Sequence, residues 1–156
     1  MTKESTSTNN RLGDVHAPSV LIIISGGVSA YKALDLMRML KKAGIRTPAI
    51  LIKGGAEFIT PLSVSALSGE AVYTDLFSLK DEQEMGHIRL SRDADLIAVI
   101  PASANMIART THGMADDLAS AVLLAADKDV QFYPAMNPQM WANAPTQDNI
   151  RTLRKR

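Results

Sequence analysis

Three segments of this 156-residue chain place glycine, small polar residues and single amide or aromatic side chains directly after short apolar runs. The first, 25–30 (SGGVSA), follows the apolar run 20–24 and precedes a helical pattern. Paired glycines let a backbone approach a ligand closely, and the free N–H groups at the start of a helix attract anions. The segment therefore predicts a phosphate site, with a tight turn that binds no ligand as the alternative. The segment matches neither the GxGxxG pattern of dinucleotide-binding proteins nor the P-loop pattern of nucleoside triphosphatases.

The other two segments offer contacts for the remainder of a cofactor or substrate. Segment 101–106 (PASANM) has small residues and one amide that suit a flat ring or a ribityl chain. Segment 134–141 (PAMNPQMW) contains two prolines, Asn137 and the only tryptophan of the chain. This composition indicates a binding segment, and a rigid proline corner with Trp141 filling the core is the alternative.

His87 is the side chain best suited to move a proton. Imidazole titrates near neutral pH, which makes histidine the usual general acid or base. His87 lies beside apolar Ile88 and Leu90 and follows a cluster of acidic residues at 81–84. The alternative is a histidine with a purely structural role.

Composition excludes several classes of protein. The chain has no cysteine, which excludes a disulfide scaffold, cysteine-bound metal and a cysteine nucleophile within it, and we expect no metal site.

Lys and Arg number 17 against 16 Asp and Glu, and residues 151–156 (RTLRKR) hold four of the cations. The rest of the chain is slightly acidic, so we expect no nucleic-acid partner. The apolar runs fall far short of the roughly 18 residues that span a bilayer, so we expect no membrane association and a cytoplasmic protein.

The elements that must position these residues follow from the alternation of apolar runs with helical patterns. Residues 1–19 are rich in Ser, Thr and Asn and predict a disordered leader, and 20–156 predict one domain. The expected strands are 20–24, 49–52, 96–100 and 130–133. The expected helices are 30–43, 61–67 capped by Thr60, one ending near 109, one capped by Asp116 and running to 126, and one from about 146. This order predicts a Rossmann-like, flavodoxin-type α/β fold with a doubly wound parallel sheet, in which ligands bind beyond the carboxyl ends of the strands.

Seven segments, in order and without an obvious gap over 20–156, resemble the flavin-containing cysteine decarboxylases, known as the HFCD flavoproteins. They are SGGVSAYKALDLMRMLKKAG, FITPLSVSALSGE, YTDLF, MGHIRLSRDADL, PASAN, GMADDLAS and PAMNPQMW. The resemblance is strongest to the decarboxylase half of the bacterial phosphopantothenoylcysteine decarboxylase/synthetases. The 50 positions between His87 and Asn137 are similar to the spacing in that family.

The resemblance implies an FMN-binding subunit that assembles as a trimer or dodecamer, with its sites between subunits. It implies that the phosphate end of FMN lies at Gly26, Gly27, Val28 and Ser29. It implies that the flavin is lined by Ser103, Ala104, Asn105, Met106 and Ala135. His87 would be the catalytic base, Asn137 would bind the substrate carboxylate, and Met140 would lie in the same site.

The activity implied by the resemblance is FMN-dependent decarboxylation of 4'-phosphopantothenoylcysteine to 4'-phosphopantetheine in coenzyme A biosynthesis. A cysteine carboxylate has no electron sink, and oxidation at the carbon bearing sulfur creates one. Two alternatives stay open. One is an oxidative peptidyl-cysteine decarboxylase that releases an enethiol, and the other is a flavin-binding regulatory subunit without turnover.

The chain departs from the family pattern at several positions. Ile52 and Gly54 stand where relatives often have Thr and Ser, and Met106 replaces a frequent Thr. Relatives in coenzyme A synthesis also carry an acidic cysteine on a substrate clamp some thirty residues beyond PAMNPQMW, and a synthetase half after that. The sequence in hand stops at Arg156, and we expect it to be a piece of a longer protein or a short member of the family.

Overall fold

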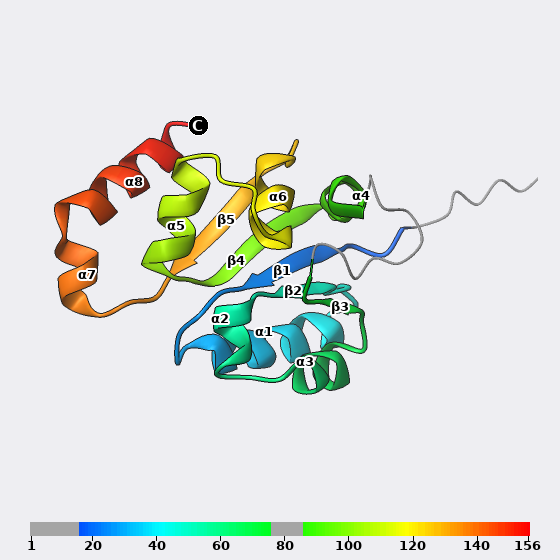
Figure 1. The fold of residues 1–156 in the computed structure, drawn as a ribbon. Coiled ribbons are helices and arrows are strands. Elements are labelled where there is room, and N and C mark those ends of the chain that lie inside the picture. Colours follow the sequence, from blue (N-terminus) through cyan, green and yellow to red (C-terminus); the bar gives the residue numbers. More distant parts are fainter. Residues whose placement is uncertain (1–15, 76–85) are drawn as a thin grey trace, which may run out of the picture.

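Five parallel strands form one sheet in the computed structural model, which describes residues 16–75 and 86–156 (Figure 1). The strands are β1 (Val20–Ile24), β2 (Ala49–Leu51), β3 (Val72–Tyr73), β4 (Leu96–Ala102) and β5 (Val130–Pro134). Their order across the sheet is β3-β2-β1-β4-β5, so the chain crosses from one half of the sheet to the other between β3 and β4. The predicted doubly wound fold is confirmed.

Eight helices of the described residues cover the sheet. They are α1 (Ala30–Lys42), α2 (Lys53–Ala56), α3 (Pro61–Ser68), α4 (Gly86–Asp93), α5 (Ala104–Thr111), α6 (Leu118–Leu124), α7 (Pro138–Ala142) and α8 (Ala144–Arg154). The helices α2, α4 and α7 and the short strand β3 were not among the predicted elements. No helix within 16–75 or 86–156 is long and apolar enough to cross a membrane.

The side chains of β1 show why the sheet is covered on both faces. Leu21 and Ile23 belong to one buried cluster, which includes residues of α5, α6 and α8. Ile22 and Ile24 belong to a second cluster, formed with residues of α1 and α3. Because successive side chains of a strand point to opposite faces, a continuous apolar run is what a strand between two helical layers requires.

Local capping explains where two predicted helices begin. Thr60 accepts a hydrogen bond from the Ser63 backbone N–H at 3.1 Å and Pro61 takes the first helical position, as predicted for α3. The predicted cap of α6 is wrong by one residue. Asp117 accepts from the Ser120 backbone N–H at 2.8 Å and forms the cap, whereas Asp116 pairs with Arg109.

Part of the predicted leader belongs to the fold. Residues 1–15 lie outside the described residues, but Ser19 is buried and bridges to Arg46 beside β1. The Arg46 backbone N–H donates to the Pro18 carbonyl at 2.8 Å. The described fold therefore includes residues that precede the predicted boundary at residue 20.

Candidate functional site

The carboxyl ends of β1 and β4 are joined by one buried hydroxyl. Ser25 Oγ donates to the Pro101 carbonyl at 2.6 Å and accepts from the Ser103 backbone N–H at 2.9 Å. Ser25 directly follows β1, so these bonds hold the glycine segment 25–30 beside the PASANM segment 101–106. Ser25 was not among the predicted site residues, although a polar residue directly after a buried strand was a signal for it.

The glycine segment offers donors to an anion at the start of α1. Ser29 is the N-cap residue of α1, yet its side chain makes no capping hydrogen bond. The backbone N–H groups of Val28 and Ser29 have no acceptor among the described residues, and the first turn of α1 has no acidic residue. Gly27 has a φ of 152°, which favours glycine, and a Cβ there would meet nothing within 4 Å. These features fit a phosphate group.

The segment after β2 packs directly against this loop. A Cβ placed on Gly26 would lie 3.1 Å from the Gly54 carbonyl oxygen, so the two backbones are in contact. Gly55 is more tightly enclosed, because a Cβ there would come within 2.8 Å of the Ile24 carbonyl oxygen. The loops after β1 and β2 therefore form one wall of the site.

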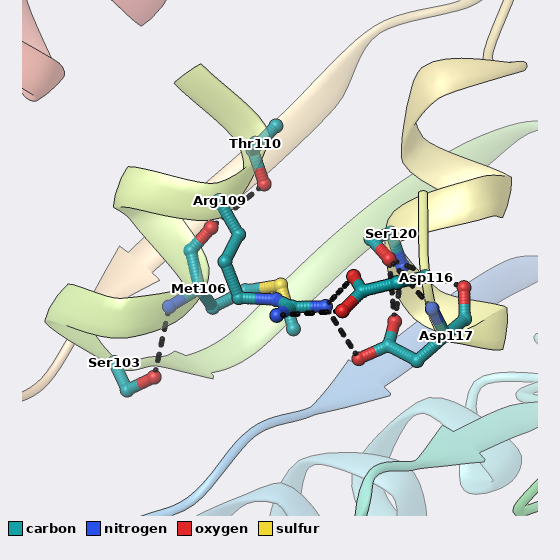
Figure 2. A network of polar contacts seen from close by, with 7 residues as sticks. All are labelled: Ser103, Met106, Arg109, Thr110, Asp116, Asp117 and Ser120. Atoms are coloured by element: carbon teal, nitrogen blue, oxygen red, sulfur yellow. Dashed lines mark hydrogen bonds and ion pairs between the residues drawn. The ribbon is translucent and has the colours of Figure 1, made fainter. Parts of the chain in front are cut away.

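The PASANM segment begins α5, and its residues divide into accessible and buried ones. Ser103 caps α5 by accepting from the Met106 backbone N–H at 3.2 Å (Figure 2). Asn105 is exposed and Ala104 is half-buried, so both can contact a ligand. The Met106 side chain is completely buried in the core cluster that also includes residues of β1, β4 and α6. Its position gives it a packing role and argues against the predicted flavin contact through this side chain.

The segment after β5 continues the same edge of the sheet. The Ala135 backbone N–H donates to the Ala102 carbonyl at 3.1 Å, which keeps the chain beside β4 just beyond the last strand residue. Asn137 then caps α7, because its Oδ1 accepts from the backbone N–H groups of Gln139 at 2.8 Å and Met140 at 3.1 Å. The cap orients the side chain so that its Nδ2 protons remain to donate. Met140 and Trp141 are both exposed on α7.

An ion-pair network fixes the other end of α5. The largely buried Arg109 guanidinium contacts the carboxylates of Asp116 and Asp117, as Figure 2 shows. The bond from Arg109 holds the pKa of Asp116 below its ordinary value. Because Asp117 also caps α6, the network ties α5 to α6 behind the PASANM segment.

His87 is not brought together with these loops within one chain. It is half-buried in the first turn of α4. In Figure 1, α4 lies beside the amino end of β4, whereas α7 lies beyond the carboxyl end of β5. The far end of α4 connects to the start of β4, where the Asp95 backbone N–H donates to the Ser19 carbonyl at 2.8 Å. The acidic residues at 81–84 lie outside the described residues. The predicted base and the predicted carboxylate ligand are therefore separated in the single chain.

The described residues also form a groove beside β5. A groove of about 700 Å³ runs along β5 between α6 and α8 and is lined by Ile107, Phe132 and Leu153 among others. It contains none of the predicted site residues. We place the candidate site at the strand ends instead, because Ser25 joins the glycine segment to the PASANM segment there and the Ala135 backbone continues the same edge.

The comparisons with known proteins define the class of this protein. Residues 7–156 match the Flavoprotein family, and the chain belongs to that family, whose cofactor is a flavin. The resemblance seen in the sequence is thereby confirmed.

Particular relatives narrow the class. The coenzyme A biosynthesis bifunctional protein CoaBC of Vibrio vulnificus is 47% identical over 137 residues, which make up 88% of this chain and 34% of the relative. The chain thus spans about a third of the length of the curated relatives that it matches.

Two solved structures share the fold. A cysteine-to-serine mutant of PPC decarboxylase, complexed with pantothenoylaminoethenethiol, has a TM-score of 0.79 and 30% identity over 89% of this chain and 78% of that one. The FMN-dependent cysteine decarboxylase SpaF has a TM-score of 0.83 and 28% identity over 90% of this chain and 81% of that one.

Proposed function

We propose that this chain is an FMN-dependent decarboxylase of 4'-phosphopantothenoylcysteine, acting in coenzyme A biosynthesis. The observation that carries the proposal is the joining at one sheet edge of an anion-binding glycine loop, the PASANM segment and a capped Asn137, in a chain similar to CoaBC and to PPC decarboxylase. Val28 and Ser29 with the two glycines before them would hold the FMN phosphate. Ser103, Ala104, Asn105 and Ala135 would line the flavin.

The chemistry divides between the cofactor and the protein. When bound, FMN would supply the reversible acceptor for the two electrons that leave the carbon bearing sulfur. His87 would take the thiol proton of the substrate. Loss of this proton, together with one hydrogen and its two electrons from the carbon bearing sulfur, would leave a thioaldehyde β to the carboxylate. The carbon–carbon bond can then break, since its electrons pass to the thiocarbonyl group as carbon dioxide departs and an enethiolate forms.

Asn137 suits a carboxylate that must leave. Its Oδ1 is held by two backbone N–H groups of α7, so its Nδ2 is positioned to donate to one carboxylate oxygen. A neutral amide orients the carboxylate without the strong ion pair that would stabilise the ground state against loss of its charge. Met140, on the same helix, would cover the apolar part of the substrate.

The separation of His87 from Asn137 supports a homo-oligomer, a trimer or dodecamer, in which a second copy completes each site. Large apolar side chains are exposed in the segments that follow the carboxyl ends of β1, β2 and β5. They include Val28 at 74%, Phe58 at 53% and Trp141 at 43% exposure. Exposed apolar side chains gathered at one edge are typical of a surface that another subunit covers.

A second outcome of the same chemistry is favoured by the absence of cysteine from this chain. The PPC decarboxylase mutant that lacks one cysteine is complexed with an enethiol rather than with a saturated thiol. Residues 1–156 alone would likewise stop at the enethiol unless a cysteine outside them supplied the acid. The mass of the product distinguishes the two outcomes, because the enethiol has two hydrogens fewer.

Flavin binding is the first test of the proposal. We expect the purified oligomer to be yellow with FMN, with a flavin absorption band that co-elutes with the protein. A folded oligomer that stays colourless in excess FMN would overturn the proposed function. Retained flavin with no decarboxylation of either a pantothenoyl or a peptidyl cysteine would favour a regulatory subunit.

A further inference from the structure

The loop after β2 places a lysine, Lys53, beside the glycine loop. Lys53 directly precedes Gly54, whose backbone touches Gly26 at the proposed phosphate site. Lys53 is exposed, and no ion pair to it is found in the part of the chain that the structure describes. Its ammonium group is therefore available to a ligand bound at the glycine loop.

The neighbouring side chains leave few other groups for this role. Segment 52–57 (IKGGAE) has no hydroxyl or amide side chain, so Lys53 is its only side-chain donor. Glu57 is the one carboxylate of the segment and is exposed, with no bond to Lys53. At the start of the neighbouring helix, the first turn of α1 contributes Lys32 and no acidic residue.

We propose that the Lys53 ammonium binds the phosphate of the flavin nucleotide and makes this chain select FMN over riboflavin. The inference rests on the proposed flavin site. A phosphate dianion needs more compensation than neutral N–H donors provide, and lysine supplies a mobile point charge with three donors. A single flexible ammonium group can take the place of hydroxyl donors that this loop lacks.

The test compares the dissociation constants of FMN and riboflavin, measured by quenching of flavin fluorescence with the whole chain. Lys53→Gln is expected to weaken FMN binding about tenfold, the effect of one charge-assisted hydrogen bond, and to leave riboflavin binding unchanged. Lys53→Arg keeps the charge and is expected to retain FMN affinity within about twofold. Lys42→Gln, in the last turn of α1, is the matched control and should change neither affinity.

Each remaining outcome decides the matter. Unchanged FMN affinity in Lys53→Gln, or equal weakening for FMN and riboflavin, would overturn the role of Lys53 while leaving the flavin site intact. If Lys32→Gln weakened FMN binding and Lys53→Gln did not, the ammonium group that binds the phosphate would be that of Lys32 in α1 instead. Failure of the unsubstituted chain to bind either flavin would overturn the proposed function itself.

Discussion

Asn137 combines two tasks that a substitution can separate. Its Oδ1 caps α7, and its Nδ2 is the proposed donor to the substrate carboxylate. Aspartate is as good an N-cap as asparagine but has no donor and brings a negative charge. We therefore expect Asn137→Asp to keep the melting temperature and to lower decarboxylation about 100-fold or more, the effect of a lost bond to a charged group with added repulsion.

Asn137→Ala is the complementary variant. It removes both the cap and the donor, so it should also cost about 1 kcal/mol of stability. The role proposed for the amide would be contradicted if Asn137→Asp turned over substrate at the rate of the unsubstituted chain.

At the scale of elements, the packing of α2 against the ends of β1 and β2 requires that residue 55 has no side chain. A Cβ there would lie 2.8 Å from the Ile24 carbonyl oxygen and 2.9 Å from Leu51 Cδ1. Gly55→Ala should therefore lower the free energy of unfolding by about 1–3 kcal/mol, the usual cost of overpacking. Gly54→Ala is the control, because its added Cβ would meet only an ordinary 3.4 Å contact. Equal stabilities of the two variants, measured by denaturant unfolding, would show that the strand ends can shift to make room.

The ion pair between Arg109 of α5 and Asp116, just before α6, should make the stability of the fold depend on pH. The pKa of Asp116 is lower in the folded chain than its ordinary value because Arg109 binds it, so the pair stabilises the fold above the ordinary pKa and loses this contribution as the pH falls through the folded one. Asp116→Asn should have a lower melting temperature than the unsubstituted chain at pH 7, and the difference should shrink progressively as the pH falls below about 4. Asp129→Asn, at an exposed carboxylate that forms no ion pair with the described residues, should show no such trend. A difference that is the same at both pH values would contradict the assignment.

The sequence predicted the long elements well because each carries a complete local signal. The strand 20–24 is a continuous apolar run, and α1 has a full amphipathic period ended by Gly44 at a φ of 77°. The short elements lacked this signal, since α2 spans one turn and contains two glycines. The helix α7 was not predicted within the segment 134–141, although Asn137 followed by Pro138 is a recognisable helix start.

The candidate site was predictable to a similar degree. The strand-end rule located the glycine loop and the PASANM segment, because the carboxyl ends of parallel strands meet at one edge. It could not reveal that the Met106 side chain faces the core or that Ser25 joins the two loops. Those details depend on tertiary packing, which no local pattern encodes.

At the scale of the whole molecule, the separation of α4 from α7 makes a prediction about assembly. If one copy supplies His87 and its neighbour supplies Asn137, two inactive variants should restore each other. We expect His87→Asn and Asn137→Asp to be inactive alone, and their co-expressed mixture to recover about a quarter of full activity by random assembly. No recovery in mixed oligomers, with heteromer formation checked by differential tags, would place both residues in a site within one chain.

The central claim is that this chain removes the carboxylate of a cysteine conjugate with the help of a flavin. The most direct measurement is the release of labelled carbon dioxide from carboxyl-labelled 4'-phosphopantothenoylcysteine by the FMN-loaded oligomer. We predict release that requires FMN and is abolished in His87→Asn while that variant still binds flavin. The account would be contradicted by a yellow, correctly assembled oligomer that leaves the labelled carboxylate in place.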